Sequence, residues 1–289
     1  MSLESYQSLV ATENKARLHL VRHCGPNRSR FCIKCGRKKV YRVADKRYRC
    51  ATCKYTFADF TGRWIGQLNI SAQQWLWLVK LFELDVSSHR IAGELELSYP
   101  TALKATHLIR LAIVAHGADF TEFAGEVELD ESYFGGKRKG KRKGKRGRGA
   151  AGKVPVFGLL ERSGQVKVEV VKDVSAQTLL DATIKTVRRG SLVYTDQFKG
   201  YNALMLCGYQ HLKVHHGKGD KHHFSRGQVY INGLEGFWSY AKERLIKHHG
   251  VSPERFPLYL KEMEFRYNHR KEKLFPILVN YLCDLVPNV

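Results

Sequence analysis

The first half of the chain carries hydrophobic residues at helical spacing. Ser71 is a residue type favoured at helix N-caps, and apolar side chains follow it at Trp75, Leu78, Val79 and Phe82. This spacing places the four side chains on one face of a helix. The pattern therefore predicts an amphipathic helix that packs its apolar face into a core.

Two further helices are predicted directly after it. A short one covers Ser88–Leu95, and a longer one is capped by Ser98, has Pro100 in its first turn and runs to about Val114. A short helix, a turn and a longer helix form the helix-turn-helix pattern, which we expect over residues 68–116. The same pattern is also compatible with an ordinary three-helix packing unit. If the domain reads DNA, the residues that open its recognition helix are Thr101, Lys104 and Thr106.

From Gly125 onward the hydrophobic spacing becomes that of strands. In Glu126–Phe134, Val127 and Leu129 lie on one face and Glu128 and Asp130 on the other. Further elements are expected as strands over 154–160 and 165–171, a helix over 176–187, a strand over 192–195, a brief helix over 201–207, a strand over 211–214 and a long helix from about 232. This order predicts an α/β fold, a mixed sheet with flanking helices whose first three strands form a meander.

Four of the seven cysteines fall in one short window. Cys32 and Cys35 form a CxxC pair, and Cys50 and Cys53 form a second pair fourteen residues further on. Two residues between thiols let a tight turn present both sulfurs to one ion, and this spacing is typical of tetrahedral zinc sites. We therefore predict a structural Zn²⁺ ion in a zinc ribbon over residues 31–60, with a small hairpin between the two pairs.

The charge balance points to a polyanionic partner. The chain has 289 residues with 49 Lys and Arg against 27 Asp and Glu, a formal charge of +22. Such an excess favours binding to nucleic acid. One glycine-punctuated run carries nine cations without an anion, and we expect it to contact phosphates as a loop, although a solvated loop or a localisation tag is an alternative. Its cations are Lys137, Arg138, Lys139, Lys141, Arg142, Lys143, Lys145, Arg146 and Arg148.

The hydrophobic pattern excludes two classes of protein. No apolar run reaches the ~18 residues that a membrane-spanning helix requires. The first sixteen residues include Glu4, Glu13 and Asn14 and lack an apolar core segment, so they do not form a signal peptide. We therefore expect a cytoplasmic protein without membrane contacts.

Three acidic residues occupy positions where a sheet presents side chains. Asp130 lies in the first predicted strand, Asp196 ends the fourth, and Glu235 lies on the helix after the fifth. Clustered carboxylates repel one another unless cations neutralise them, and Mg²⁺ or Mn²⁺ prefers carboxylate oxygens. Two such ions ~3.5–4 Å apart can activate an attacking oxygen and stabilise a leaving oxygen in phosphodiester cleavage. The trio therefore predicts a two-metal site for polynucleotidyl transfer.

Helix geometry adds a lysine to this set. Asn232, Glu235, Ser239 and Lys242 fall on one stripe of the predicted helix, beside its apolar face. Glu235 and Lys242 lie two turns or ~10 Å apart on that stripe. The carboxylate can then reach the sheet edge while the lysine reaches a bound DNA strand.

Three sequence blocks carry a family resemblance. They are ELDESYFGG at 128–136, YTDQFKGY at 194–201 and NGLEGFWSYAK at 232–242, with FRYNHR at 265–270 as a weaker fourth. Over about residues 28–275 the chain resembles bacterial insertion-sequence transposases of group fifteen-ninety-five, which have an N-terminal zinc ribbon and a DD(E/N)K catalytic set. The resemblance implies an RNase H-like core that cuts and joins DNA at element ends, and a bacterial, nucleoid-associated location.

The resemblance assigns roles by position. Asp130 and Asp196 match the two aspartates and Lys242 matches the lysine, while Asn232 and Glu235 both lie in the block of the third ligand. We favour Glu235, because asparagine is a neutral ligand and Glu235 precedes Lys242 by two helical turns. Arg266 and Arg270 are equally compatible with clamping a phosphate and with simple solvation.

The sequence also allows two other functions. A regulator with an inactive α/β domain would bind DNA without cutting it, and an RNase H-like nuclease would cut without joining strands. Transposition pairs two DNA ends, so we expect a homo-oligomer on DNA. The expected organisation is an N-terminal segment over 1–30, the zinc ribbon over 31–60, the helix-turn-helix-like domain over 68–116, the catalytic domain over 125–275 and a C-terminal helix over 276–289.

Overall fold

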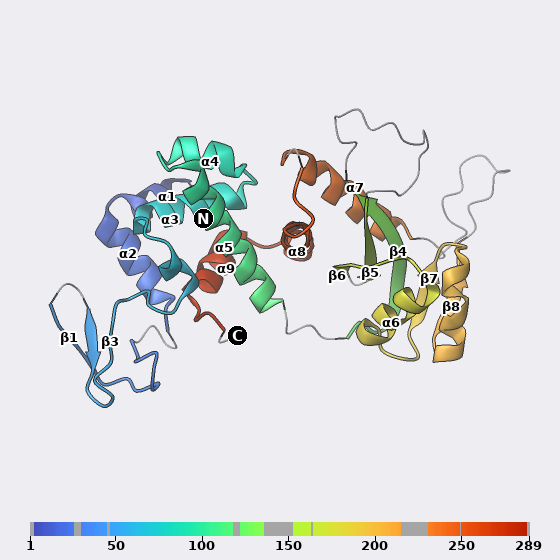
Figure 1. Ribbon diagram of the computed structural model, residues 1–289, viewed down its shortest axis with the longest axis horizontal. Helices are drawn as coiled ribbons and strands as arrows, with labels where there is room; N and C mark the ends of the chain where they lie inside the picture. The colour runs from blue at the N-terminus through green and yellow to red at the C-terminus, as the bar shows by residue number, and fades with distance from the viewer. Residues whose placement is uncertain are drawn as a thin grey trace. The chain divides into compact units, whose positions relative to one another are not determined.

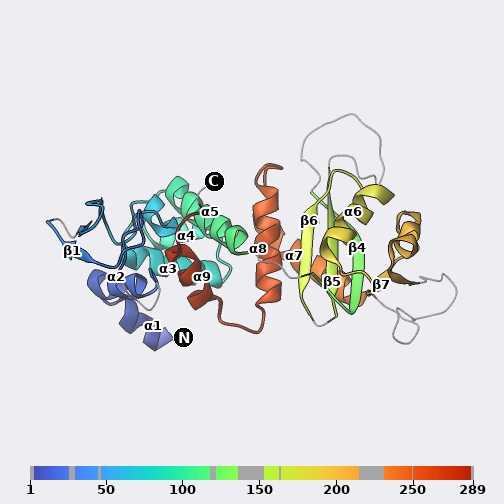
Figure 2. The ribbon, with the colours of Figure 1, turned by 90° about the horizontal axis from the view of Figure 1, so that it is seen from below.

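The computed structural model places most of the chain in two compact units. It describes residues 3–25, 30–44, 47–117, 122–135, 153–162, 164–214, 231–248 and 250–287. The helical unit combines Met1–Ala118 with His269–Val289, and the sheet unit is Asp119–Asn268. Figures 1 and 2 show the elements of both units.

A small antiparallel sheet lies near the start of the helical unit. It consists of β1 (Val40–Arg42), β2 (Tyr48–Cys50) and β3 (Thr56–Phe57), in that order. β1 and β2 form the hairpin expected between the two cysteine pairs, and β3 adds a third strand to it. The core beneath this sheet is minimal, because its only fully buried side chains within the described residues are Cys32, Cys50 and Phe57. So small a core requires further stabilisation.

The helices of this unit begin where the sequence places their caps. Before α3 (Ala72–Glu83), the Ser71 hydroxyl accepts a hydrogen bond from the Gln74 backbone and the Gln74 side chain accepts one from the Ser71 backbone. This reciprocal pair satisfies two donors that a helix start leaves open. Ser98 caps α5 (Tyr99–His116) in a similar way through the Thr101 backbone.

The remaining helices complete the helical unit. They are α1 (Leu3–Val10), α2 (Glu13–Arg22), the 3₁₀ helix η2 (Trp64–Gln67), α4 (Ser88–Glu94) and α9 (Leu274–Cys283). The C-terminal helix, expected over 276–289, is α9, and it packs on α3 and α5 within this unit. No helix among the described residues is both long and apolar enough to span a bilayer.

The second unit is built on a five-stranded mixed sheet with the order β6-β5-β4-β7-β8. Its strands are β4 (Glu126–Phe134), β5 (Val154–Glu161), β6 (Val166–Val170), β7 (Leu192–Thr195) and β8 (Gln210–Lys213). The first three pair as an antiparallel meander, whereas β7 and β8 join parallel to β4. This topology and the flanking helices confirm the predicted fold class, an α/β RNase H-like mixed sheet.

Two separate cores cover the two faces of this sheet. Val127 and Leu129 of β4 pack with α6 (Ala176–Thr186) and the 3₁₀ helix η3 (Lys199–Cys207). The opposite face packs against α7 (Asn232–Ile246) and α8 (Phe256–Asn268). The alternation expected in β4 is therefore present, and it directs Glu128 and Asp130 toward α7.

Side chains of α8 close the β6 edge of the sheet. Asn268 accepts a hydrogen bond from the Val166 backbone N–H and donates one to its carbonyl, each 2.8 Å long, and Glu264 accepts from the Val168 N–H at 2.7 Å. These contacts occupy groups that an edge strand would otherwise offer to another chain.

A buried ion pair lies in the same helix. Arg266 is 5% exposed and its Nε donates to Glu262, 1% exposed, across 2.8 Å. The two groups depend on each other, because an unpaired charge in a protein interior is costly.

We predict that Glu262→Ala destabilises the protein by about 3–5 kcal/mol, because it removes the carboxylate that pairs with the buried Arg266 guanidinium. Urea unfolding measures this change. Glu243→Ala, at an exposed position of α7, serves as the control and should change stability by no more than about 0.5 kcal/mol. Equal effects of the two substitutions would contradict the prediction.

Candidate active site and metal centre

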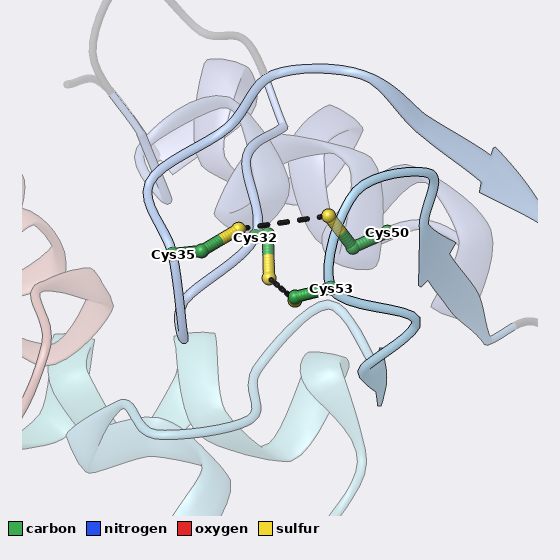
Figure 3. Close-up of side chains that lie close together, drawn as sticks. All are labelled: Cys32, Cys35, Cys50 and Cys53. Carbon is green, nitrogen blue, oxygen red and sulfur yellow. Dashed lines mark hydrogen bonds between the residues drawn. The ribbon is translucent and has the colours of Figure 1, made fainter.

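Four cysteines converge at the base of the small antiparallel sheet (Figure 3). All four sulfurs lie within 4.8 Å of one another, with Cys32 Sγ 3.5 Å from Cys53 Sγ and Cys35 Sγ 3.6 Å from Cys50 Sγ. A tetrahedron with Zn–S bonds of ~2.3 Å places its sulfurs ~3.8 Å apart. The arrangement therefore fits a structural zinc ion.

Backbone groups prepare one of these thiols for metal binding. The backbone N–H groups of Cys53 and Thr52 point at the Cys50 sulfur and lower its pKa to about 6. Zinc binds thiolates, so a lowered thiol pKa favours coordination at neutral pH.

Asp130 lies in β4 on the face covered by α7. Its Oδ2 accepts a hydrogen bond of 2.9 Å from the indole Nε1 of Trp238, which belongs to α7. Burial raises the pKa of Asp130 from its ordinary value of 3.8 to about 7, the Trp238 hydrogen bond opposes this shift, and the nearby carboxyl groups of Glu131 and Asp196 add to it. The protein alone thus disfavours the ionised form of Asp130, which a nearby cation would favour.

Asp196 follows directly after β7, at the carboxyl edge expected from the sequence. Its Oδ1 accepts a 2.8 Å hydrogen bond from the Phe198 backbone, which holds the side chain in a local turn. Its charge also contributes to the raised pKa of Glu131, which is caused first by burial. Glu131 in turn accepts a 2.5 Å hydrogen bond from the Tyr201 hydroxyl. The structure therefore brings Asp130 and Asp196 into electrostatic contact, with Glu131 beside them.

The polar residues expected on one stripe of α7 are all exposed. They are Asn232, Glu235, Ser239 and Lys242. Lys242 Nζ lies 5.6 Å from the ring centre of Phe134, at the end of β4. Within the described residues, the cysteines form the only group of three or more His, Cys, Asp or Glu side chains close enough to hold one ion. The convergence of Asp130, Asp196 and Glu235 on shared cations therefore stays a prediction, and Glu235 and Asn232 are equally exposed as the third ligand.

Sequence reasoning missed a second polar contact between β4 and α7. Glu128 is 1% exposed, and its Oε2 accepts a 3.0 Å hydrogen bond from the Leu234 backbone N–H in the first turn of α7. Arg162 lies 3.6 Å from its other carboxylate oxygen. The sequence contained enough information to predict this contact. Glu128 lies on the same strand face as Asp130 and therefore points toward the same helix.

The DNA-contact residues expected from the sequence fall into different environments. Lys104 is exposed and Thr101 is half-buried at the start of α5. Thr106 instead is 1% exposed and hydrogen-bonds with Ser88 in the helical core, because it lies on the inward face of α5. The cations of the run over 137–148 lie outside the described residues.

The two arginines near the end of α8 also differ. Arg266 is buried against Glu262, so its guanidinium is committed to the interior rather than to a phosphate, whereas Arg270 is exposed. The sequence places Arg266 and Arg270 one helical turn apart and does not distinguish their environments. The burial of Arg266 depends on how α8 packs.

Comparisons with known proteins agree on one family. Residues 122–268 match the family described as "ISXO2-like transposase domain", and residues 11–56 match the "Transposase zinc-ribbon domain". A transposase-like protein of Haemophilus influenzae is 38% identical over 38% of this chain and 85% of its own length. A protein in the transposable element ISH50 of Halobacterium salinarum is 28% identical over 82% of this chain and 84% of its own length.

Solved structures with lower similarity were also found. The catalytic core domain of BIV integrase is 13% identical, with a TM-score of 0.33, over 54% of this chain and 94% of that chain. The Mos1 strand transfer complex is 13% identical, with a TM-score of 0.29, over 72% of this chain and 74% of that chain.

We predict that Cys50→Ser removes the bound zinc and unfolds residues 31–60, because the small core there contains little besides the metal site. Zinc content by mass spectrometry and amide exchange in β1–β3 measure this change. Cys207→Ser, at a half-buried thiol of the sheet unit, should leave the zinc content unchanged. Full zinc content in the Cys50 variant would contradict the assignment.

We predict that Asp130→Asn stabilises the protein above pH 7. The folded state raises the pKa of Asp130 to about 7, so the wild-type protein loses stability as the pH rises from about 4 to 7. The amide removes this loss and still accepts a hydrogen bond from Trp238, which gives a gain of about 2 kcal/mol at pH 8. Urea unfolding across this pH range, in buffer without divalent cations, measures the gain, and a gain independent of pH would contradict the electrostatic cause.

Proposed function

The chain belongs to the ISXO2-like transposase family and is a DNA transposase; from this premise we propose that Asp130, Asp196 and Glu235 hold the divalent cations with which it cleaves DNA and transfers strands. The observation that carries the proposal is that Asp130 and Asp196 lie close enough for the charge of Asp196 to raise the pKa of Asp130, inside the family match over residues 122–268. Their carboxyl groups raise the local negative charge where the family's sequence blocks converge.

The metals proposed for this site are Mg²⁺ or Mn²⁺. When bound, they would activate the attacking oxygen and stabilise the leaving oxygen of an in-line displacement at phosphorus. Asp130 would help to hold these ions, because it lies on β4, the strand that pairs with β7 and packs against α7. Asn232 is the alternative to Glu235 as third ligand, since both are exposed in the first turn of α7.

Positive side chains of this chain would hold the DNA. Lys242 is exposed on α7 with its Nζ 5.6 Å from the Phe134 ring centre, and its ammonium group can bind a phosphate of the cleaved strand. The net charge of +22 supplies the general attraction for duplex DNA. Within the helical unit, Thr101 and Lys104 open α5, the candidate recognition helix, and the zinc ribbon forms a second candidate DNA contact.

Strand transfer joins two paired element ends to target DNA. A homo-oligomer assembled on DNA would bring two catalytic sheets to the paired ends. Within one protomer, the proposed division of labour follows the expected domains, with end recognition over 31–60 and 68–116 and catalysis over 125–275. A regulator would bind the element ends without cutting them, and a general nuclease would cut any duplex. Cleavage that is specific to the element ends therefore distinguishes a transposase from both.

We predict that the protein nicks and joins a plasmid carrying the DNA that flanks its gene, and that this reaction requires Mg²⁺ or Mn²⁺. Asp130→Asn and Asp196→Asn should each reduce cleavage more than about 100-fold, since loss of a direct ligand should exceed the loss seen for its supporting groups. End binding, measured by gel shift, should remain within about twofold, because neither residue belongs to the proposed recognition modules.

Two further variants identify the third ligand. Glu235→Gln should reduce cleavage to the level of the aspartate variants, whereas Asn232→Ala should retain most activity. Glu243→Gln, on the same helix but outside the proposed site, is the control. Wild-type cleavage by Asp130→Asn would exclude Asp130 from catalysis, and equal cleavage of unrelated plasmids would favour the general nuclease.

A further inference from the structure

An aromatic side chain of α7 reaches into the proposed catalytic centre. Trp238 is 5% exposed, and its Nε1 donates the 2.9 Å hydrogen bond to Asp130 Oδ2. Helical geometry places Trp238 one turn after Glu235 and one turn before Lys242. The contact with Asp130 therefore lies between the two exposed groups that α7 is proposed to supply.

A glycine in the neighbouring strand makes this contact possible. β4 and β5 pair so that Asp130 lies opposite Gly158. A Cβ atom at position 158 would lie 2.5 Å from Cζ2 and 2.6 Å from Cη2 of Trp238, closer than atoms in proteins approach. The absence of a side chain at Gly158 lets the indole lie close enough to the sheet for its nitrogen to reach Asp130.

Other rings fix the orientation of the indole. Phe134 meets it edge-on with a centroid distance of 5.8 Å, and Phe237 meets it with a distance of 5.2 Å. A ring held on several sides has one orientation, so the N–H group points in one direction. A rigid donor of this kind fixes the rotation of the carboxylate that accepts from it.

We propose that Trp238 and Gly158 are positioning residues for catalysis: the Trp238 indole N–H orients the Asp130 carboxylate for metal binding and sets the register of α7 against β4, and Gly158 provides the space for the ring. This inference rests on the proposed role of Asp130. Groups that hydrogen-bond to metal ligands orient them in this way, and their loss typically costs 10–100-fold in metal affinity or activity.

The test compares the same substitution at two buried tryptophans. Trp238→Phe keeps an aromatic ring and removes the donor, and it should lower kcat for end cleavage by about 10–100-fold and raise the Mg²⁺ concentration for half-maximal rate. The Kd for end DNA should stay within about twofold. Trp75→Phe is the control, because Trp75 is 2% exposed in α3 and its Nε1 has no hydrogen-bond partner among the described residues. It should leave kcat and the Mg²⁺ dependence unchanged.

A measurement without catalysis tests the contact itself. The chain has 4 tryptophans, so substituting Trp64, Trp75 and Trp77 in turn assigns three indole ¹H–¹⁵N signals and leaves the fourth to Trp238. Asp130→Ala removes the acceptor and should move the Trp238 signal, while the Trp75 signal stays in place. An unmoved Trp238 signal would overturn the inference, and this readout does not require the Trp238 variant to fold.

A double-mutant cycle tests the role of Gly158. Gly158→Ala alone should reduce cleavage because the added methyl group displaces the indole. In the Trp238→Phe background the same change should cost less, since the clashing ring atoms are absent, and strictly additive losses would contradict the assigned role.

The outcomes separate the two proposals. Retained cleavage by Asp130→Asn overturns the proposed function. An inactive Asp130→Asn variant together with wild-type kcat and Mg²⁺ dependence in Trp238→Phe overturns only the positioning role.

Discussion

The packing of α7 onto β4 is the contact on which the proposed catalytic site depends. Two polar side chains on one face of β4 receive hydrogen bonds from this helix, Glu128 from the Leu234 backbone and Asp130 from the Trp238 indole. Polar groups in an apolar interface require partners with defined geometry, so these bonds permit far fewer arrangements than apolar packing alone. The helix that carries Glu235 and Lys242 is consequently fixed relative to the strand that carries Asp130.

The packing of α7 onto β4 buries carboxyl groups, which is electrostatically unfavourable. This arrangement is consistent with a site that binds cations. Burial raises the pKa of Asp130 and of Glu128, and hydrogen bonds from α7 counteract both shifts. Asp196 adds repulsion at the sheet edge. A protein optimised for stability alone would not collect carboxyl groups there, whereas a site that binds divalent cations requires them. The cysteine cluster presents the contrasting case, because its four thiols serve the fold of a segment with almost no core of its own.

Much of the fold could be predicted from the sequence because local chemistry determined it. Ser71 and Ser98 cap their helices, the CxxC pairs meet, and the alternation after Glu126 gives the central strand with its two faces. The candidate site was only partly accessible in this way. Strand order placed Asp130 near Asp196, but burial of Thr106 and Arg266 depends on packing between helices, which periodicity does not specify. The Trp238 contact depends on the Asp130–Gly158 register, a pairing between segments that no local pattern encodes.

The most direct test is anomalous diffraction from crystals of the DNA-bound protein grown with Mn²⁺. We expect a manganese peak between the carboxylates of Asp130 and Asp196, with a third ligand from the first turn of α7 and the Trp238 indole still bonded to Asp130. Manganese bound elsewhere on the sheet unit, with no peak at these two aspartates, would contradict the proposed catalytic centre.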